Sequence, residues 1–574
     1  MKKIYIIFLA ALTLGSCQDV LDLEPQDSLS DGVFWASENT IQGYVDRAYL
    51  MLGGYQTTRI GTPRPMTWGH FRGEATDEAY PHIVWGGGQD ITNNRLNPDT
   101  QEYIGGWKNF YPILQHINVF FDNYEQGRFD VEQSKLDVWL AEMHFLRAWY
   151  HNQLIKCYGG VIIADQLFSP DDPVDQVRAS YDDCVDFILA ELELAIPNLP
   201  ETATPGRITS GAALGVKAQV LLHHASPLHN PNNDMNRWTL AANACKAVID
   251  LPQYSLYGMP GSDIAYRDVW YHTPSMGNTE VIMAKYMNTE NLVHFFNYSS
   301  TLFGLPSWGG WGLATPIQSL VDAFQMADGT EFDRATYGQD PYSNRELRFY
   351  ETILYDGAHF SETMPRVPSG DLIGYKVESG VYHEFDSNGD TITRPGYDRQ
   401  GGVLQETKNF TRTGYYCHKH VRDDHTSKFQ KGTVAFCPFM RLTEFYLHYA
   451  ECLVMLGDGA GARDYVLPIR QRALMPDESL PAVLTMDDIM HEKRVELAFE
   501  DHRFFDVRRW MILDQTFVNV EKVDVYTDRT VDPEVKTYTY SLLQERIYDE
   551  KLYYMPIPQG EINKNPLLEQ NPGY

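Results

Sequence analysis

Basic residues are scarce in this chain. Only 47 lysines and arginines face 77 aspartates and glutamates in 574 residues, which leaves a net charge of -30. Such an excess of negative charge repels nucleic acid and anionic lipid headgroups. The composition therefore disfavours nucleic-acid binding and membrane attachment through basic patches, and it leaves neutral molecules, cations and proteins as partners.

Long apolar runs are also missing after the first sixteen residues. No later window approaches the ~20 consecutive apolar residues that a membrane-spanning helix needs. We therefore expect the body of the chain to be soluble and any membrane attachment to come from elsewhere.

Cysteine is sparse and its spacing matches no zinc module. Seven cysteines occur, and no two are close enough to form a CxxC pair. Most of them lie on apolar helical stripes and are expected to be small buried side chains. Cys417 and Cys437 bracket a predicted strand pair, and an exported protein can oxidise such a pair, so their state stays open.

The first seventeen residues are typical of a bacterial lipoprotein signal. Lys2 and Lys3 precede the apolar run 4–14, and Gly15 and Ser16 stand directly before Cys17. The apolar run is too short to anchor the chain, and small residues give a peptidase access to the backbone. We predict that residues 1–16 are a signal peptide and that Cys17 carries lipid, each buried CH₂ contributing roughly 0.8 kcal/mol. A plain secretory signal is the alternative, but it needs no cysteine after the small residues.

Helical periodicity dominates three stretches of the chain, at about 39–54, 107–250 and 440–512. Leu214, Ala218 and Leu222 share one face of a helix, as do Phe445 and Tyr449. Besides the helices that carry these two faces, further helices are predicted at about 39–54, 107–125, 132–157, 177–195, 236–250, 460–474 and 486–512. They come in adjacent pairs with small residues between them, as in tetratricopeptide-like hairpins. The predicted fold class is mainly α, a scaffold of helical pairs.

Two stretches between these helices, about 55–104 and 251–439, are rich in Gly, Pro, Asn, Asp and aromatic residues. The clearest hairpin signal joins 381–385 to 391–393 through a Ser-Asn-Gly-Asp turn at 387–390. We therefore predict one domain over 17–574, in which these loop-rich insertions lie on the helical scaffold and form the ligand face.

No cluster of polar residues makes a convincing metal or catalytic motif. His491-Glu492 begins like a zinc-protease helix, but Val495 replaces the second histidine. The turn at 386–390 imitates the start of a calcium loop, but Tyr397 replaces the required glutamate. A denser group is treated as a polar loop: Cys417, His418, His420, Asp423, Asp424 and His425. We predict no metal and no cofactor, and we expect the charged run 494–509 to form structural ion pairs.

Aromatic residues give the main binding signal, at 13% of the chain. Flat aromatic faces beside amide, guanidinium and carboxylate groups suit a sugar ring, which has an apolar C–H face and a polar rim. The alternative is that each ring pins its loop to the scaffold. The predicted ligand contacts are Trp68, Arg72, Asp77, Tyr80, Trp85, Asn93, Tyr298, Trp308 and Trp311.

Several sequence blocks, read in order, resemble the SusD/RagB-like outer-membrane lipoproteins. They include Leu21-Asp22 with Phe34-Trp35 near the front and the closing Gln570-Asn571-Pro572-Gly573-Tyr574. Between these lie four further blocks: 141–150 with 158–161, 206–228, 449–451, and 496–500 with Arg503, Asp506 and Arg509-Trp510.

The resemblance implies a fold of four tetratricopeptide-like units that supports a variable, loop-rich face. It implies a non-catalytic, cell-surface protein, anchored through Cys17 in the outer membrane and facing the exterior. Such a protein captures a glycan and delivers it to a SusC-like TonB-dependent transporter. Alternatives are a peptide-binding RagB-like uptake protein, a surface glycoside hydrolase with two paired carboxylates, and a helical-repeat scaffold for proteins. The resemblance leaves the ligand and the stoichiometry with the transporter open.

Overall fold

A computed structural model describes most of the chain. The described residues are 34–50, 52, 72–81, 88–100, 104–169, 173–288, 303–360, 375–402, 404, 408–419, 421 and 434–574, with the backbone alone at 287–288 and 434–437. The predicted signal at 1–16 and the predicted site residues Cys17, Trp68, Trp85 and Tyr298 lie outside this set. His420, Asp423, Asp424 and His425 lie outside it as well.

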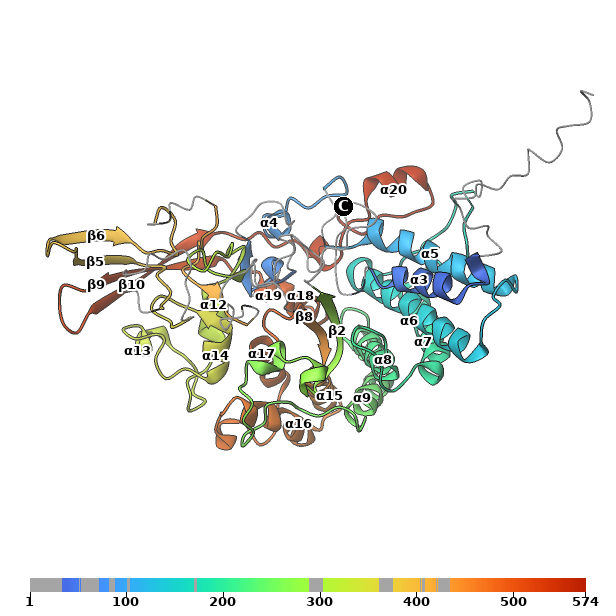
Figure 1. Cartoon of the computed structure of the whole chain (residues 1–574). Helices are drawn as coiled ribbons and strands as arrows, with labels where there is room; N and C mark the ends of the chain where they lie inside the picture. The colour runs from blue at the N-terminus through green and yellow to red at the C-terminus, as the bar shows by residue number, and fades with distance from the viewer. Residues whose placement is uncertain are drawn as a thin grey trace, which may run out of the picture.

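One end of the molecule is a helical region (Figure 1). It consists of α3 (Glu38–Ala48), α5 (Trp107–Glu125), α6 (Gln133–Tyr158), α7 (Tyr181–Ala195), α8 (Ser210–Ala225) and α9 (Met235–Ile249). Two predicted boundaries were wrong. The helix predicted from residue 177 begins at Tyr181, because the Ser180 hydroxyl caps it by accepting the N–H of Asp183. The helix predicted to reach residue 54 ends at Ala48, and Lys285 Nζ binds the carbonyls of Leu50 and Leu52 beyond it.

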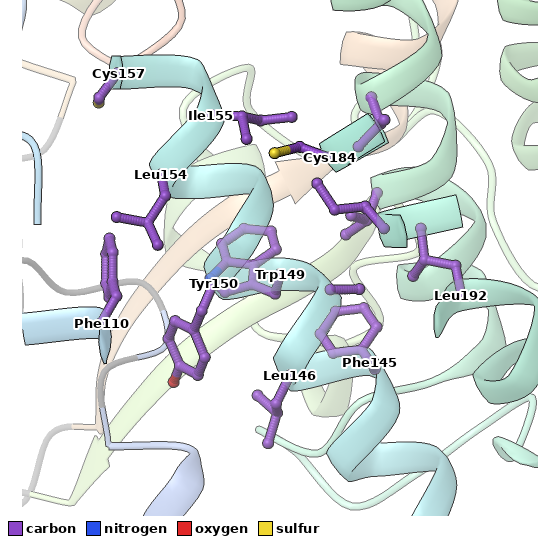
Figure 2. Packing of buried hydrophobic residues seen from close by; sticks show 14 of the residues in the cluster. Phe110, Phe145, Leu146, Trp149, Tyr150, Leu154, Ile155, Cys157, Cys184 and Leu192 are labelled. Atoms are coloured by element: carbon purple, nitrogen blue, oxygen red, sulfur yellow. The ribbon is translucent and has the colours of Figure 1, made fainter. Parts of the chain in front are cut away.

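The helices of this region pack in adjacent pairs, as predicted. α6 packs against α5 and α7, and α8 packs against α9. Figure 2 shows Tyr150 and Leu154 of α6 on the side of Phe110 of α5, and Ile155 of α6 beside Cys184 of α7. Because α6 has neighbours on several sides, its buried residues surround the helix instead of forming one stripe. These side chains belong to the first and larger apolar core of the described chain.

A second group of helices lies in the middle of the molecule (Figure 1). It contains α15 (Leu442–Met455), α16 (Gly459–Arg472), α17 (Met486–Glu496), α18 (Arg503–Arg509) and α19 (Leu513–Thr516). α15 packs against both α9 and α16 and so joins this group to the helical region.

The single helix predicted over 486–512 was wrong. The chain turns out of the helical conformation after Glu496, with positive φ at Phe499 and Asp501 (63° and 67°). Lys419 Nζ lies 2.7 Å from the carbonyl oxygen of Glu496 and 3.0 Å from that of Ala498. A lysine from a distant segment thus satisfies carbonyls that a further helical turn would otherwise use.

The opposite end is a strand region built on one four-stranded sheet (Figure 1). Its strands are β5 (Val381–Phe385), β6 (Thr391–Pro395), β9 (Val520–Asp528) and β10 (Val535–Gln544), in the order β10-β9-β5-β6. The predicted β5–β6 hairpin is present, and it pairs in parallel with β9 through Val381 and Tyr526. The β9–β10 hairpin was not predicted.

Short elements fill the stretches that were predicted to be irregular. They are β1 (Ala79–Pro81), β2 (Val281–Asn288), β3 (Ala314–Pro316), β4 (Ile353–Leu354), β7 (Tyr416–Cys417), β8 (Val434–Arg441), α4 (Gly88–Thr92), α10 (Asp268–Tyr271), α12 (Gln318–Ala323), α13 (Arg334–Tyr337) and α14 (Leu347–Thr352), with α20 (Gln559–Lys564) near the C-terminus. Cys417 lies in the β4–β7 pair and Cys437 in the β2–β8 pair, so the two do not bracket one strand pair.

A buried network of charges lies where the strand region meets the central helices. It balances five cations with five carboxylates: Arg348, Lys419, Arg441, Arg470 and Arg472 with Glu280, Glu346, Glu492, Glu496 and Glu500. Burial alone would raise the pKa of Glu496, but Arg472 and Arg441 outweigh it and lower that pKa to about 2. The run 494–509 therefore forms structural ion pairs, as predicted.

The described helices show no candidate for crossing a membrane, because none is both long and apolar enough.

The second apolar core lies in the strand region and holds Trp308, Phe349, Phe360, Tyr415 and Val523.

Candidate functional site

The predicted site residues of the first loop stretch are mostly buried. Arg72 and Asp77 are each 3% exposed and Tyr80 is 6% exposed. Arg72 pairs with Asp501, and Asp77 accepts two bonds of 2.8 Å from Arg503. Burial would raise the pKa of Asp77, but Arg494 and Arg503 hold it well below its usual range. These side chains support the fold and are closed to a ligand here, so the expectation of free polar contacts at these positions was wrong.

Trp308 is also buried, with none of its surface exposed. Its ring meets Phe360 edge to face at 6.0 Å between centroids. The following glycines allow a tight reversal: Gly309 has φ of 96°, and a Cβ at Gly310 would lie 2.2 Å from the backbone of Gly304. The reversal folds the Trp308 indole into the second core, so the expectation that the two glycines leave it uncovered was wrong.

Trp311 and Asn93 keep partial exposure. Trp311 packs against the edge of the second core. Asn93 lies after α4, where its Oδ1 accepts a 3.1 Å bond from Gln544 Nε2 of β10. Among the predicted contacts that the structure describes, these two residues still offer surface to a ligand, and their role as contacts stays a prediction.

A polar recess of about 300 Å³ lies beside the Trp308–Trp311 turn. Its walls come from the loop after β6, the loop before β7, and strands β9 and β10. The lining residues are Ser379, Arg399, Gln400, Phe410, Thr411, Arg412, Gly414, Lys522, Val523, Asp524 and Leu543.

Contacts on both sides connect the recess to the two predicted loop stretches. The Ser307 N–H donates a 2.9 Å bond to Asp398, the residue before Arg399. A Cβ at Gly312 would lie 3.7 Å from the backbone of Phe410. On the other side, Leu543 packs against the small apolar cluster of Tyr80. The recess therefore lies between the segments that the sequence pointed to, although none of its lining residues was predicted.

The loop that carries Arg399 is fixed by a buried carboxylate. Asp398 accepts backbone N–H groups of Ser307 and Glu378, at 2.9 and 3.1 Å. Complete burial raises the pKa of Asp398 to about 6 despite these bonds. This side chain ties the segment before the Trp308–Trp311 turn to the segment before β5, which contributes Ser379 to the recess.

The recess offers groups for binding, and its lining offers a single carboxylate. Asp524 receives bonds of 2.7 Å from both Arg399 and Lys522. Partial burial opposes them, but these bonds lower the pKa of Asp524, so the group stays ionised and is a poor proton donor. A glycosidase needs two carboxyl groups about 5 to 9.5 Å apart, and the lining residues do not supply that pair.

A larger and more apolar cavity of about 500 Å³ lies between α5 and the C-terminal segment around α20. Trp107, Tyr111 and Phe168 contribute rings, and Glu561 and Lys564 line its outer side. Tyr111 is held by a 3.0 Å bond from its hydroxyl to the carbonyl of Ile162. This cavity belongs to the helical region and lies apart from the Trp308–Trp311 turn.

One group of described residues has the spacing of a metal site. Ligand atoms of Glu444, His448 and His502 lie within 4.8 Å of one another. Glu444 Oε1 already accepts a 2.6 Å bond from Gln219, and the ammonium groups of Lys156 and Lys493 act on the same carboxylate. Burial nevertheless outweighs these ammonium groups and raises the pKa of Glu444 to about 7, so this buried carboxyl is held by hydrogen bonding as part of the packed interior. We therefore assign the group a structural role.

The comparisons with known proteins cover the whole chain. Residues 279–574 match the profile of the SusD family, and residues 74–222 match a profile described as "Starch-binding associating with outer membrane". A SusD-like protein of Formosa agariphila is 28% identical over 100% of this chain and 99% of its own. A SusD-like protein of Bacteroides ovatus is 23% identical over 100% and 98%.

Solved structures agree with this fold. The crystal structure of a SusD-like protein from Bacteroides fragilis superposes with a TM-score of 0.72 at 26% identity, covering 96% of this chain and 100% of that one. A laminarin-binding SusD-like protein gives a TM-score of 0.61 at 19% identity, covering 94% and 100%. The profile match spans more than half of the sequence, so this chain belongs to the SusD family of carbohydrate-binding proteins.

Proposed function

We propose that the protein is a glycan-binding lipoprotein of the cell surface that captures an oligosaccharide without cleaving it. The observation that carries this proposal is the polar recess beside the Trp308–Trp311 turn. It combines guanidinium, ammonium, amide and hydroxyl groups with the apolar side chains of Phe410, Val523 and Leu543. Such a set binds the polar rim of a sugar ring and leaves an apolar face for its C–H groups.

Similar proteins support the carbohydrate half of the proposal. One is named for laminarin binding, and another is a surface glycan-binding protein of Bacteroides uniformis with a TM-score of 0.62 at 19% identity, covering 93% of this chain and 99% of that one. The lining of the recess, with one ionised carboxylate at Asp524, supports binding without hydrolysis.

The same proposal includes the anchor and the partner. Lipid on Cys17 holds the protein on the outer face of the outer membrane, and the bound glycan passes to a SusC-like TonB-dependent transporter. The helical region supplies a rigid frame for that assembly. The profile match to proteins associating with the outer membrane supports this placement.

Affinity electrophoresis and calorimetry of the purified protein against neutral glycans, acidic glycans and peptides test the ligand class. We expect glycan binding without release of reducing sugar. Peptide binding with no response to any glycan would favour a RagB-like peptide carrier, and release of reducing ends would favour a hydrolase.

The anchor has its own test. Cys17→Ala should move the protein out of the membrane fraction or block its maturation, while the purified variant keeps the melting temperature of the mature chain. Protease treatment of intact cells that leaves the wild-type protein uncut would contradict the outward orientation.

A further inference from the structure

The charge of the polar recess is opposite to that of the whole chain. Arg399, Arg412 and Lys522 line it together with one carboxylate, Asp524, whereas the chain carries a net charge of -30. Composition alone led us to expect neutral molecules, cations or proteins as partners. The recess is a local exception, because its lining has two more positive than negative groups.

Two of these cations are held in place by the carboxylate that they share. Arg399 Nη2 and Lys522 Nζ each lie 2.7 Å from an oxygen of Asp524. Arg399 Nη1 also donates a 3.2 Å bond to the carbonyl of Ser379. The Asp524 carboxylate therefore neutralises one charge and orients both cations, which reduces the rotational freedom that a ligand would otherwise have to restrict.

Arg412 adds a positive charge with no carboxylate within ion-pair distance among the described residues. It is exposed, but its backbone is fixed. The Thr411 hydroxyl accepts N–H groups of Thr413 and Gly414, at 3.1 and 3.0 Å, and the Thr413 carbonyl accepts the N–H of Val523 at 2.9 Å. The guanidinium thus projects from a rigid turn at the rim of the recess.

Among the residues that the structure describes, the carboxylates next to the recess, Glu378 and Asp398, are engaged by other groups. Glu378 lies 2.7 Å from Arg394 and 3.2 Å from Arg529. Asp398 is buried, and its two carboxylate oxygens accept the backbone N–H groups of Ser307 and Glu378. The positive charge at the rim therefore remains available to a ligand.

We propose that this recess holds an acidic sugar residue, whose carboxylate or sulfate ester lies against Arg412 and the Arg399–Lys522 pair. This inference rests on the glycan-binding function proposed above and adds the class of glycan. A guanidinium presents two parallel N–H donors that match the paired oxygens of a carboxylate or sulfate. Thr411 and Gln400, which also line the recess, can bind ring hydroxyls.

Calorimetric titration of the purified full-length protein tests the proposal with defined oligosaccharides. The probes are oligogalacturonate for a carboxylate, a sulfated galactan oligosaccharide for a sulfate ester, and laminari- and malto-oligosaccharides as neutral glycans. Inorganic sulfate serves as a competitor that carries charge without sugar. We expect an acidic oligosaccharide to bind more tightly than either neutral one and to lose affinity as sodium chloride is raised.

Charge substitutions sharpen the test. Arg412→Gln should weaken acidic-glycan binding about 10- to 100-fold, because hydrogen bonds to charged groups contribute more than neutral ones. Arg412→Lys should retain part of that affinity, because it keeps the charge but loses the planar pair of donors. Lys135→Gln, which removes a positive charge from the exposed surface of α6, should change nothing.

The possible outcomes distinguish a failure of the acidic subsite from a failure of the proposed glycan-binding function. If neutral glycans bind as tightly as acidic ones, or if Arg412→Gln weakens both equally, the acidic subsite is wrong and the glycan-binding function stands. If inorganic sulfate binds as tightly as the sulfated oligosaccharide, the recess is a simple anion site and the proposal fails. If no glycan binds, both proposals fail.

Discussion

The helical region and the strand region of this protein are stabilised in different ways. In the helical region, one large apolar core runs between helices that are neighbours in sequence. In the strand region, a smaller apolar core lies next to a buried network of ten charges whose members come from distant segments. Apolar packing tolerates many substitutions of similar size. Removal of one partner of a buried ion pair is strongly destabilising, because it leaves an unpaired charge in the interior. The recess lies in the region that depends on specific long-range pairs.

The largest loss of stability is expected when the buried charge network is broken. Arg472 is fully buried, and its guanidinium reaches both Glu280 and Glu496. Arg472→Met leaves two buried carboxylates with fewer cations, and we expect a loss of about 3–5 kcal/mol in the free energy of unfolding. Urea unfolding followed by circular dichroism measures this loss.

Arg463 of the same helix is the matched control. It is only partly buried and donates to the carbonyl of Asp477. Arg463→Met should change the unfolding free energy by less than about 0.5 kcal/mol. Equal effects of the two substitutions would show that the network contributes no more than an ordinary surface group.

A second large effect is expected at Trp308, because its indole fills the core of the strand region. Trp308→Ala should cost about 3–5 kcal/mol of stability through lost burial and the cavity left behind. The affinity for glycan, measured per folded molecule, should stay the same. An unchanged melting temperature with weakened binding would contradict the buried position of the ring.

The two regions also differ in how well the sequence predicts them. The helices predicted over 107–125 and 132–157 agree with α5 and α6 within a residue. In α5 the apolar spacing records packing on one face, whereas α6 is apolar on several sides over a length that suits a buried helix. The break after Glu496 was missed, because it depends on Lys419, which is distant in sequence. The β9–β10 hairpin was missed, although Val523 and Val525 alternate with polar residues, because only β9 has a buried face.

The candidate site illustrates the same limit. The sequence pointed to loop stretches on both sides of the recess, and Trp311 and Asn93 lie in them with partial exposure. It could not show that Trp308 turns inward, since the reversal at Gly309 and Gly310 is a matter of backbone geometry. Arg399, Arg412 and Lys522 meet only through the parallel pairing of β5 with β9 and the contacts around it, which no local pattern reveals.

Acid should act with opposite sign on one buried group in each region, His151 and Asp398. Burial lowers the pKa of His151, in α6 of the helical region, to about 4 from an ordinary value of about 6.5. The unfolded chain therefore binds this proton first as the pH falls from about 6.5 to 4, and up to about 3 kcal/mol of stability is lost. Burial raises the pKa of Asp398, in the strand region, to about 6 from about 3.8. Its folded form takes the proton first, so up to about 3 kcal/mol is gained as the pH falls from about 6 to 3.8.

Thermal melts of two variants between pH 7 and pH 4.5 test these signs. The destabilisation caused by His151→Gln, relative to wild type, should shrink toward pH 4.5, because the wild-type protein itself loses stability there. The destabilisation caused by Asp398→Asn should grow toward pH 4.5, because the wild-type carboxyl is then uncharged. Parallel trends in the two variants would contradict the opposite pKa shifts.

The smallest effect is expected at Trp311, where the loss of glycan affinity and the loss of stability on substitution show whether the ring contacts ligand or only packs. This ring is half-buried at the edge of the second core, so part of it remains accessible. By analogy with stacking of bases on aromatic rings, Trp311→Ala should weaken glycan binding by about 1–3 kcal/mol. Because the ring is only partly buried, its loss should lower the melting temperature less than Trp308→Ala does. Thermal melts and glycan titrations of both variants decide the matter. If Trp311→Ala lowers stability as much as Trp308→Ala and leaves the affinity unchanged, then both indoles of the turn serve packing alone and the recess binds its sugar through polar groups.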